Sequence, residues 1–247
     1  MLRVFYARHR AASMWSKAIA DDIATTLGLR FQIYYIHDQW AEYGTLGDAV
    51  AAQGLDFLML TNARQMDVDT LPESRGVHLF RDPRDMVVSG YFSHRNSHPI
   101  EVDGVIWKEL IRHRINLLKM DRDAGMAAEV EFSGYFLDHM LSWNYDAPNT
   151  LAVRMEDLVS DSAAQWRRVL AHWQVLDLLP DGYLDELLRT YTFDQLAGGG
   201  RKVGQEDETS HYRKGIAGDW RNHLTDDHLA LFRKRYGDLV ERLGYAW

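Results

Sequence analysis

Residues 2–23 read LRVFYARHRAASMWSKAIADDI, and this stretch decides the fold class. The β-forming residues of Arg3–Tyr6 predict a short buried strand. A loop with two arginines follows, and Ser16–Ile23 has the pattern of a helix. A strand, a basic loop and a helix in this order are typical of an α/β protein that binds an anion where the helix begins.

Four further segments predict strands because β-forming residues cluster in them: 31–36, 56–61, 76–80 and 151–155. Helical patterns occupy the sequence between and after them. Because strands and helices alternate, we expect an α/β fold with a mainly parallel central sheet flanked by helices on both faces.

Four helices carry clear signals in the sequence. Residues 83–95 and 104–123 have helical patterns, and a third helix is expected at 160–173 with Ser160 as its cap. A last helix begins at Thr225 and its apolar stripe runs to Leu243. Residues 198–211 begin with three glycines and predict a loop.

The composition excludes several classes of function. The chain has 247 residues, a formal net charge of −8 and no cysteine. No stretch resembles a linker, so we expect one domain over residues 1–247. Without cysteine there is no disulfide framework, thiolate metal site or cysteine nucleophile.

The acidic net charge argues against nucleic-acid binding. No apolar run reaches the roughly twenty residues that span a bilayer and no signal peptide is visible, so a cytoplasmic location is expected.

The loop Arg8–Trp15 suits an anion. Backbone N–H groups at a helix start, the helix dipole and an adjacent cation together attract a phosphate. The spaced glycines and the Gly-Lys-Ser/Thr ending of a Walker loop are absent. By itself the loop leaves an ordinary strand-to-helix turn open as the alternative.

A second anion-binding pattern is FRDPRDMVVS at residues 80–89. Arg81 ends a predicted strand, so it would face a ligand at the carboxyl edge of the sheet. Pro83 suits the first turn of the next helix, and Ser89 lies two turns further along. The alternative is that Arg81 pairs with Asp85 and that Ser89 is a small packing residue.

The third pattern, HYRKGIAGDWRNH at residues 211–223, is the most specific of the three. Arg213 and Lys214 precede Gly215, so two cations and a backbone N–H can converge on one phosphate.

In this order, the three segments resemble the signature of cytosolic-type sulfotransferases that use 3′-phosphoadenosine-5′-phosphosulfate (PAPS). The resemblance extends from residue 5 to residue 223. It implies a P-loop-like three-layer α/β sandwich that moves the sulfuryl group of PAPS to a hydroxyl or amine and releases adenosine 3′,5′-bisphosphate (PAP). It implies no metal, because a sulfuryl group carries less charge than a phosphoryl group.

The resemblance assigns site residues one by one. Arg10 falls at the family lysine of the 5′-phosphosulfate loop, and the phosphate-cradling turn corresponds to Ala11, Ala12, Ser13 and Met14. The residues matched to the adenine are Trp15 and the segment Tyr191–Phe193, in which Phe193 is the cofactor-binding candidate. The residues matched to the 3′-phosphate are Arg81, Ser89, Arg213, Lys214 and Gly215.

Departures from the family pattern bear on the chemistry. Arg10 replaces a lysine, and since the pKa of arginine lies above about 12 we expect Arg10 to stabilise charge rather than donate a proton. The family glycine is missing from the loop, and Met155 replaces a tyrosine near the adenine.

The usual base is also replaced. Asn62 ends the third predicted strand where the family has a histidine, and an amide cannot take up the acceptor's proton. We expect Asn62 to orient the acceptor. The other candidate bases each have a surface or structural role as the alternative: His9, His94, His98, Asp56 and Glu42.

The pair His94 and His98 has the i, i+4 spacing of metal ligands. No third ligand stands at a telling spacing and Pro99 ends the helix, so we expect a loop or substrate-facing role for the pair.

The sequence leaves the acceptor open. It can be a small molecule or a glycan, with Phe92–Tyr145 as the expected wall of its site and Gly198–Tyr212 as the lid. The sequence also leaves open whether the protein forms a homodimer. The alternatives to a sulfotransferase are a catalytically impaired PAP- or PAPS-binding protein, suggested by Asn62, and a P-loop phosphotransferase, which would need a Walker lysine and an acidic magnesium ligand.

Overall fold

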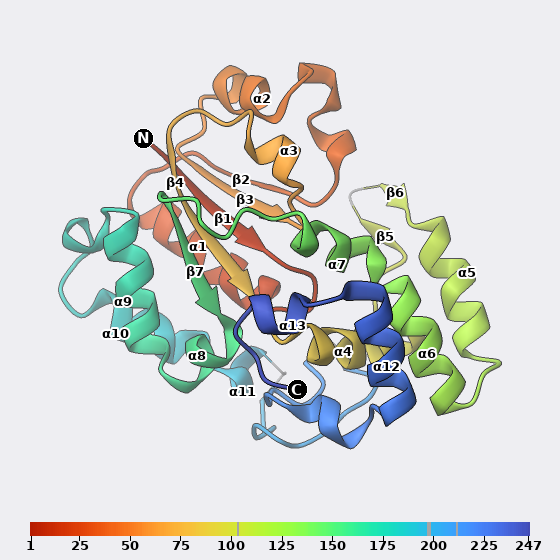
Figure 1. Cartoon of the computed structure of the whole chain (residues 1–247). Helices are drawn as coiled ribbons and strands as arrows, with labels where there is room; N and C mark the ends of the chain where they lie inside the picture. Colours follow the sequence, from red (N-terminus) through yellow and green to blue (C-terminus); the bar gives the residue numbers. More distant parts are fainter. Residues whose placement is uncertain (103, 197–198, 211) are drawn as a thin grey trace. The chain divides into compact units, whose positions relative to one another are not determined.

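The computed structural model describes residues 1–102, 104–196, 199–210 and 212–247. Within them the chain forms two compact units. Unit 1 consists of Met1–Arg81 and Ser142–Thr192, and unit 2 of Asp82–Leu141 and Phe193–Trp247. Figure 1 labels the helices and strands of both. A single domain over the whole chain stays a prediction.

Unit 1 is built on a parallel sheet whose strands lie in the order β2-β3-β1-β4-β7 (Figure 1). The strands are β1 (Leu2–Ala7), β2 (Phe31–Tyr34), β3 (Phe57–Thr61), β4 (Ser74–Phe80) and β7 (Thr150–Arg154). All four pairings are parallel, which confirms the mainly parallel sheet and the five strands that the sequence predicts. Ala7 lies opposite Thr61 and Leu79, so β1, β3 and β4 end at one edge.

Two apolar layers cover the sheet of unit 1. Successive side chains of a strand point to opposite faces, and in β1 Phe5 packs on one core while Val4 and Tyr6 pack on the other. The first core includes residues of α1 (Ser13–Thr26), α9 (Ser162–His172) and α10 (Tyr183–Thr190). The second includes residues of α2 (Leu46–Gln53) and Trp40. The expected arrangement of helices on both faces of a sheet is therefore confirmed.

The remaining elements of unit 1 are short. They are η1 (His37–Gln39), η2 (Ala41–Tyr43), α3 (Gln65–Val68), α8 (Met155–Ser160) and η3 (Leu176–Leu178).

Unit 2 is organised around α4 (Pro83–Asn96). Asp82 accepts the Arg84 N–H and Pro83 occupies the first turn, so the helix begins where the sequence predicts. Every residue from Pro83 to His94 is buried, because neighbouring elements cover α4 on all sides. Gly90 is needed for this packing, since a Cβ there would lie 2.5 Å from the Glu129 Oε1.

The other elements of unit 2 are helical apart from one hairpin. The helices are α5 (Lys108–Leu117), α6 (Arg122–Phe132), α7 (Gly134–Leu141), α11 (Phe193–Leu196), η4 (Asp219–Asn222), α12 (Asp226–Tyr236) and α13 (Leu239–Arg242). The hairpin pairs β5 (Glu101–Val102) with β6 (Val105–Ile106). None of the described helices combines the length and apolar character needed to cross a membrane.

Three helix predictions are wrong in their boundaries. The helix expected at 104–123 is divided, because Asp121 caps the start of α6 by accepting the Ala124 N–H. Ser160 ends α8, and Asp161 rather than Ser160 caps α9. The last helix is capped by Thr225 as expected but ends at Tyr236, since Gly237 takes φ 59°.

The predicted loop is confirmed for residues 199–210, which form neither helix nor strand. The predictions for Gly198 and His211 concern positions outside the described residues.

Candidate functional site

At the carboxyl edge of the unit 1 sheet, hydrogen bonds join the first loop to the end of β3. The Asn62 N–H donates to the Ala7 carbonyl at 2.9 Å. The Asn62 side-chain oxygen in turn accepts the His9 N–H at 2.8 Å. The residue that replaces the family histidine therefore fixes the backbone of the Arg8–Ala12 loop.

The loop backbone is strained. Arg10, Ala12 and Asn62 take φ values of 62°, 55° and 54°, and among the described non-glycine residues only Gln174 shares this left-handed region. Such a conformation costs about 1–2 kcal/mol in residues with a Cβ. Ala12 therefore holds a backbone conformation that glycine would adopt without this cost.

Helix α1 begins directly after this loop. Ala12 is its N-cap, and no described side chain caps it or places an acidic group in its first turn. The Ser16 N–H closes the first helical bond to the Ala12 carbonyl at 3.0 Å. The N–H groups of Ser13, Met14 and Trp15 precede this bond, and together with the helix dipole they are suited to an anion.

Arg8 begins the anion loop predicted from the sequence, but sequence reasoning assigned its side chain no role of its own. Its side chain is fully buried. The Nε donates to His78 Nε2 and one terminal nitrogen donates to the Ala63 carbonyl, both at 2.7 Å. The guanidinium lies 4.4 Å from the ring centre of Trp143. In the sequence, the feature that could have indicated burial of Arg8 is its position one residue after the buried strand.

Unit 1 also contains three residues that the resemblance to the family names. Arg81 follows the last residue of β4 and is buried. Trp15 and Met155 are both half-buried and pack against the core that contains α1 and α9.

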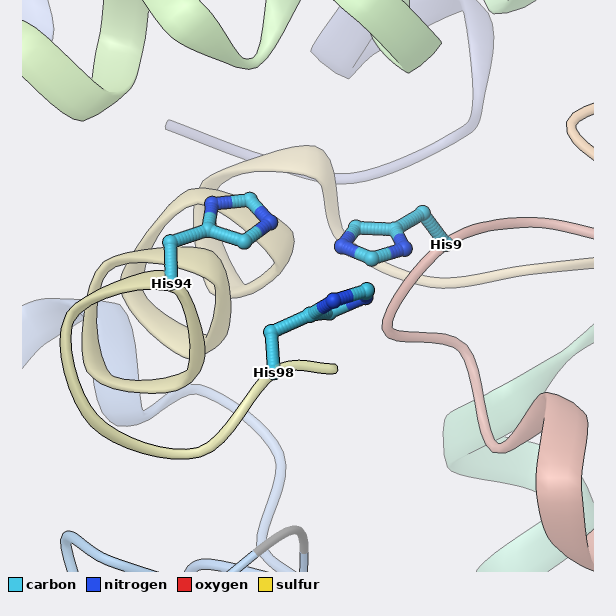
Figure 2. A group of neighbouring side chains, drawn as sticks. All are labelled: His9, His94 and His98. Carbon is cyan, nitrogen blue, oxygen red and sulfur yellow. The ribbon is translucent and has the colours of Figure 1, made fainter. Parts of the chain in front are cut away.

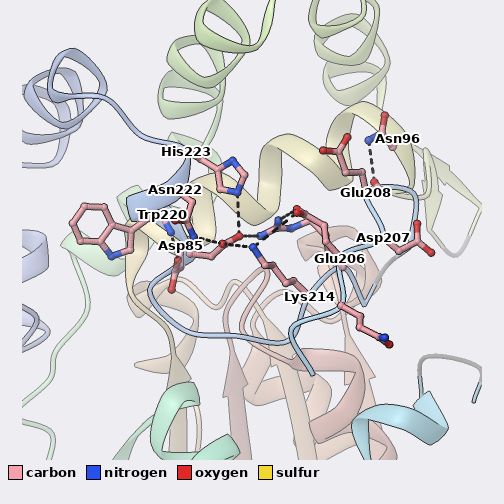
Figure 3. A network of polar contacts seen from close by, with 12 residues as sticks. Asp85, Asn96, Glu206, Asp207, Glu208, Lys214, Trp220, Asn222 and His223 are labelled. Atoms are coloured by element: carbon pink, nitrogen blue, oxygen red, sulfur yellow. Dashed lines mark hydrogen bonds and ion pairs between the residues drawn. The ribbon is translucent and has the colours of Figure 1, made fainter. Parts of the chain in front are cut away.

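In unit 2, Asp85 joins the third segment to α4. Its carboxylate accepts the Gly218 N–H at 2.6 Å and the Trp220 N–H at 2.8 Å (Figure 3). These bonds fix the start of η4 and hence the chain that follows Lys214. Asp85 thus holds the backbone at the start of η4 within unit 2. The pairing of Arg81 with Asp85, which the sequence leaves open, stays a prediction.

Arg213 and Lys214 share their acidic partners. Both donate to Asp219 and both form ion pairs with Glu206, with Lys214 Nζ 2.7 Å from Asp219 Oδ1 (Figure 3). Burial opposes the charge of Asp219, but hydrogen bonds from Lys214, Asn222 and Arg213 outweigh it and hold its pKa far below the usual value. One carboxylate, which is ionised at neutral pH, therefore brings the two cations to one point.

Arg213 lies next to the face of α4 that carries Ser89. Ser89 and Phe92 are three residues apart and share a helix face. The Arg213 guanidinium lies 4.5 Å from the ring centre of Phe92. Gly215 takes φ 69°, the left-handed conformation that favours glycine. The structure thus brings Ser89 and Arg213 to one part of unit 2, with Lys214 and Gly215 directly following in the chain.

His94 lies on α4, so the loop role expected for it is wrong, while the substrate-facing role stays a prediction. It is fully buried, and its Nδ1 is 2.8 Å from Glu129, whose second oxygen is 2.8 Å from His113 Nε2. Burial raises the pKa of Glu129, but the two histidines outweigh it and the net shift is downward. Figure 2 shows His94 with His98, and the His98 Nδ1 lies 2.7 Å from the Pro99 carbonyl.

Two groups within unit 2 have the composition of a metal site. They are His94 with His113 and Glu129, and Glu206 with Asp219 and His223. In each group the candidate ligand atoms lie within 4.8 Å of one another. Helices α5 and α6 supply the partners of His94, and no spacing along the sequence could have identified them.

Phe193 is the first residue of α11, and its side chain, for which the adenine contact was predicted, lies outside the described part of the chain.

Comparisons with known proteins agree with one another. A family profile described as "Sulfotransferase domain" matches residues 67–244. Sulfotransferase 6B1 of Danio rerio is 26% identical over 150 residues, covering 60% of this chain and 46% of the relative. The chain therefore spans about half the length of that relative.

Solved structures share the fold. The structure of mouse sulfotransferase SULT7A1 complexed with PAP has a TM-score of 0.61 at 16% identity, covering 98% of this chain and 88% of that one. Retinol dehydratase in complex with androsterone and PAP has a TM-score of 0.55 at 16% identity, covering 99% of this chain and 82% of that one.

Proposed function

The chain belongs to the sulfotransferase family, and on this premise we propose that it transfers the sulfuryl group of PAPS to a hydroxyl or amine of a small-molecule or glycan acceptor, releasing PAP. The observation that carries the proposal is the convergence of Arg213 and Lys214 on Asp219, with Arg213 beside the face of α4 that carries Ser89. A terminal phosphate is bound well by a donor set of two cations, a hydroxyl and a glycine N–H.

We assign the 3′-phosphate of the nucleotide to Ser89, Arg213, Lys214 and Gly215. Arg81 is assigned to the same phosphate by its match to the family. The cations would exchange their carboxylate partners for the phosphate, and half-exposed Glu206 can move more easily than buried Asp219. Arg213 donates in a fixed fork while Lys214 acts as a point charge, so the two residues supply direction and charge respectively.

We assign the 5′-phosphosulfate to Arg10 and to the turn Ala11–Met14, with Trp15 and Phe193 at the adenine. When bound, PAPS supplies the sulfuryl group, whose bond to the phosphate breaks as a bond to the acceptor forms. The protein stabilises the charge left on the phosphate oxygen through the Arg10 guanidinium and the first N–H groups of α1. Because Arg10 stays protonated, its role is electrostatic.

Asn62 is assigned to the acceptor as an orienting residue. Its side-chain oxygen accepts the His9 N–H, so an acceptor would meet the amide nitrogen, which only donates. An amide cannot remove the acceptor's proton. A PAP- or PAPS-binding protein of weak activity is therefore the second candidate, and Asn62 is the observation that favours it. No Walker lysine stands in the loop, which disfavours a phosphotransferase.

The acceptor wall at Phe92–Tyr145, the lid at Gly198–Tyr212, a homodimer and a cytoplasmic location remain parts of this proposal. Gly198 and His211 of the lid lie outside the described residues.

Calorimetric titration with PAP, ADP, and ATP with magnesium tests the nucleotide class. We expect selective binding of PAP, and a loss of at least about tenfold in affinity in Arg213→Ala, since a charge-assisted hydrogen bond contributes about 1.5–3 kcal/mol. Arg112→Ala is the matched control, because the Arg112–Glu109 pair lies exposed on α5. Equal or tighter binding of ATP would contradict the proposal. Turnover of PAPS over a panel of phenols, alcohols and amines then separates an enzyme from a binding protein.

A further inference from the structure

The buried guanidinium of Arg8 has no anionic partner. Its contacts are the neutral His78 ring, the Ala63 carbonyl and the face of Trp143. Within the described residues no carboxylate forms an ion pair with it, and its second terminal nitrogen is buried without a hydrogen-bond partner. Arg84, the other arginine that is almost completely buried, donates two bonds to the Asp82 carboxylate. Unit 1 therefore buries a charge that the usual carboxylate does not balance.

The hydrogen bond from Arg8 to His78 requires a protonated guanidinium and a neutral imidazole, and burial keeps both groups in these states. Burial lowers the pKa of Arg8 to about 10, which still leaves the guanidinium charged at neutral pH. Burial, and secondarily the charge of Arg8, lower the pKa of His78 well below its usual value. His78 therefore stays neutral and accepts the Arg8 Nε–H. The net charge of the buried pair is positive.

The position of Arg8 relates this charge to the first loop. The Arg8 N–H donates to Leu79 of β4 at 3.3 Å, and its carbonyl accepts the Ala11 N–H at 3.1 Å. Its side chain reaches Ala63, directly after Asn62. Arg8 thus connects the ends of β1, β3 and β4, and Arg10, Asn62 and Arg81 stand at these same ends.

Burying an uncompensated charge is costly for stability, and replacement of such a group by an apolar side chain of similar volume is often neutral or stabilising. Its presence at this position is explained if an anion completes the charge balance. We propose that Arg8 is a buried source of positive potential beneath the Arg8–Ala12 loop, which selects ligands that carry an anionic 5′ group. Arg8 acts through the low-polarity interior and through the loop it holds, without touching the ligand. This inference rests on the proposed function of that loop.

The test compares ligands that differ only in the 5′ group. Titration with PAP and with adenosine 3′-monophosphate measures how much the 5′-phosphate adds to affinity. In Arg8→Met we expect PAP to bind at least about tenfold more weakly, since a charge at several ångströms in a protein interior contributes on the order of a tenfold factor. Adenosine 3′-monophosphate should bind within about twofold of the unchanged protein, and the melting temperature should stay equal or rise.

Arg3→Met is the matched control, because Arg3 lies near the start of β1, the strand that Arg8 directly follows, and donates to the Trp173 carbonyl. It should leave both affinities unchanged. Arg8→Lys keeps the charge and should retain most of the preference for PAP. If Arg8→Met does not fold, Arg8→Gln removes the charge while keeping a polar side chain and is read in the same way.

Equal weakening of both nucleotides in Arg8→Met, or none, overturns the inference while the proposed function stands. If the unchanged protein does not bind PAP, the proposed function fails and the inference fails with it.

Discussion

At the scale of single residues, backbone strain gathers around the first loop. Arg10, Ala12 and Asn62 all hold left-handed conformations that residues with a Cβ avoid. Strained residues persist where surrounding contacts fix them, and the bonds among Ala7, His9 and Asn62 do so here. The loop is thus held in one shape by contacts within unit 1.

Ala12 offers a direct measure of this strain. In Ala12→Gly we expect the free energy of unfolding to rise by about 0.5–1 kcal/mol, because relief of the left-handed conformation outweighs the greater freedom of glycine in the unfolded chain. Urea denaturation measures the change.

Ala11→Gly is the control for Ala12→Gly. Ala11 is fully buried, and its φ is not among the positive values of the described residues. Glycine there should lower stability. A loss of stability in Ala12→Gly would show that the loop gains nothing from a glycine and would contradict the strain argument.

At the scale of elements, the sequence predicts strands better than helix boundaries. Strands buried in a parallel sheet are continuous apolar runs, so all five could be found. The prediction of one helix at 104–123 is wrong because Asp121 caps a new helix. In the sequence Asp121 looks like any charged surface residue. The boundary depends on local capping that a helical pattern alone does not show.

The same contrast holds for the candidate site. The third segment could be assigned because Arg213, Lys214 and Gly215 are consecutive in the chain. Arg8 was missed because burial beside His78 and Trp143 depends on strands far apart in sequence. The His94–Glu129–His113 cluster was missed for the same reason, since three different helices supply it.

The loop before the third segment carries a carboxylate that, under the proposed function, would compete with the phosphate for two cations. Glu206 pairs with both Arg213 and Lys214 and is half-exposed. In Glu206→Gln we expect PAP to bind about two- to fivefold more tightly, because a partly exposed ion pair contributes at most about 1 kcal/mol. Titration calorimetry at constant ionic strength measures this.

Glu208→Gln is the matched control, since Glu208 lies in the same loop and pairs with Arg122 instead. Its PAP affinity should not change. Weaker PAP binding in Glu206→Gln would mean that Glu206 positions the two cations rather than competing for them.

At the scale of the whole molecule, one buried and two half-buried histidines make stability depend on pH. The pKa values of His78, His172 and His223 are all lowered, with burial as the first cause in each case. The unfolded chain binds these protons near pH 6.5, while the folded chain does not until lower pH. The stability from these groups is therefore present above about pH 6.5 and is lost as the pH falls below it.

His78→Gln tests this at one position, because glutamine can still accept the Arg8 Nε–H. Between pH 6.5 and pH 5 the free energy of unfolding should fall less steeply than in the unchanged protein, by up to about 1.4 kcal/mol per pH unit. Urea denaturation across this range measures the slope. His37→Gln, at an exposed histidine, should leave the slope unchanged. An unaltered slope in His78→Gln would mean that His78 takes up its proton in the folded state.

Unit 1 is discontinuous in the chain, and this affects its synthesis on the ribosome. Strands β1 to β4 are complete by Phe80, but β7, which pairs with β4, begins at Thr150, and the unit ends at Thr192. From Phe80 to the end of β7 at Arg154 the ribosome adds 74 residues, which at about 5–20 residues per second takes roughly 4–15 s. During that time the outer edge of β4 has no partner strand, so the nascent chain carries an open β-edge that other chains can pair with. Slower translation of residues 82–150 would lengthen this period and increase aggregation during synthesis.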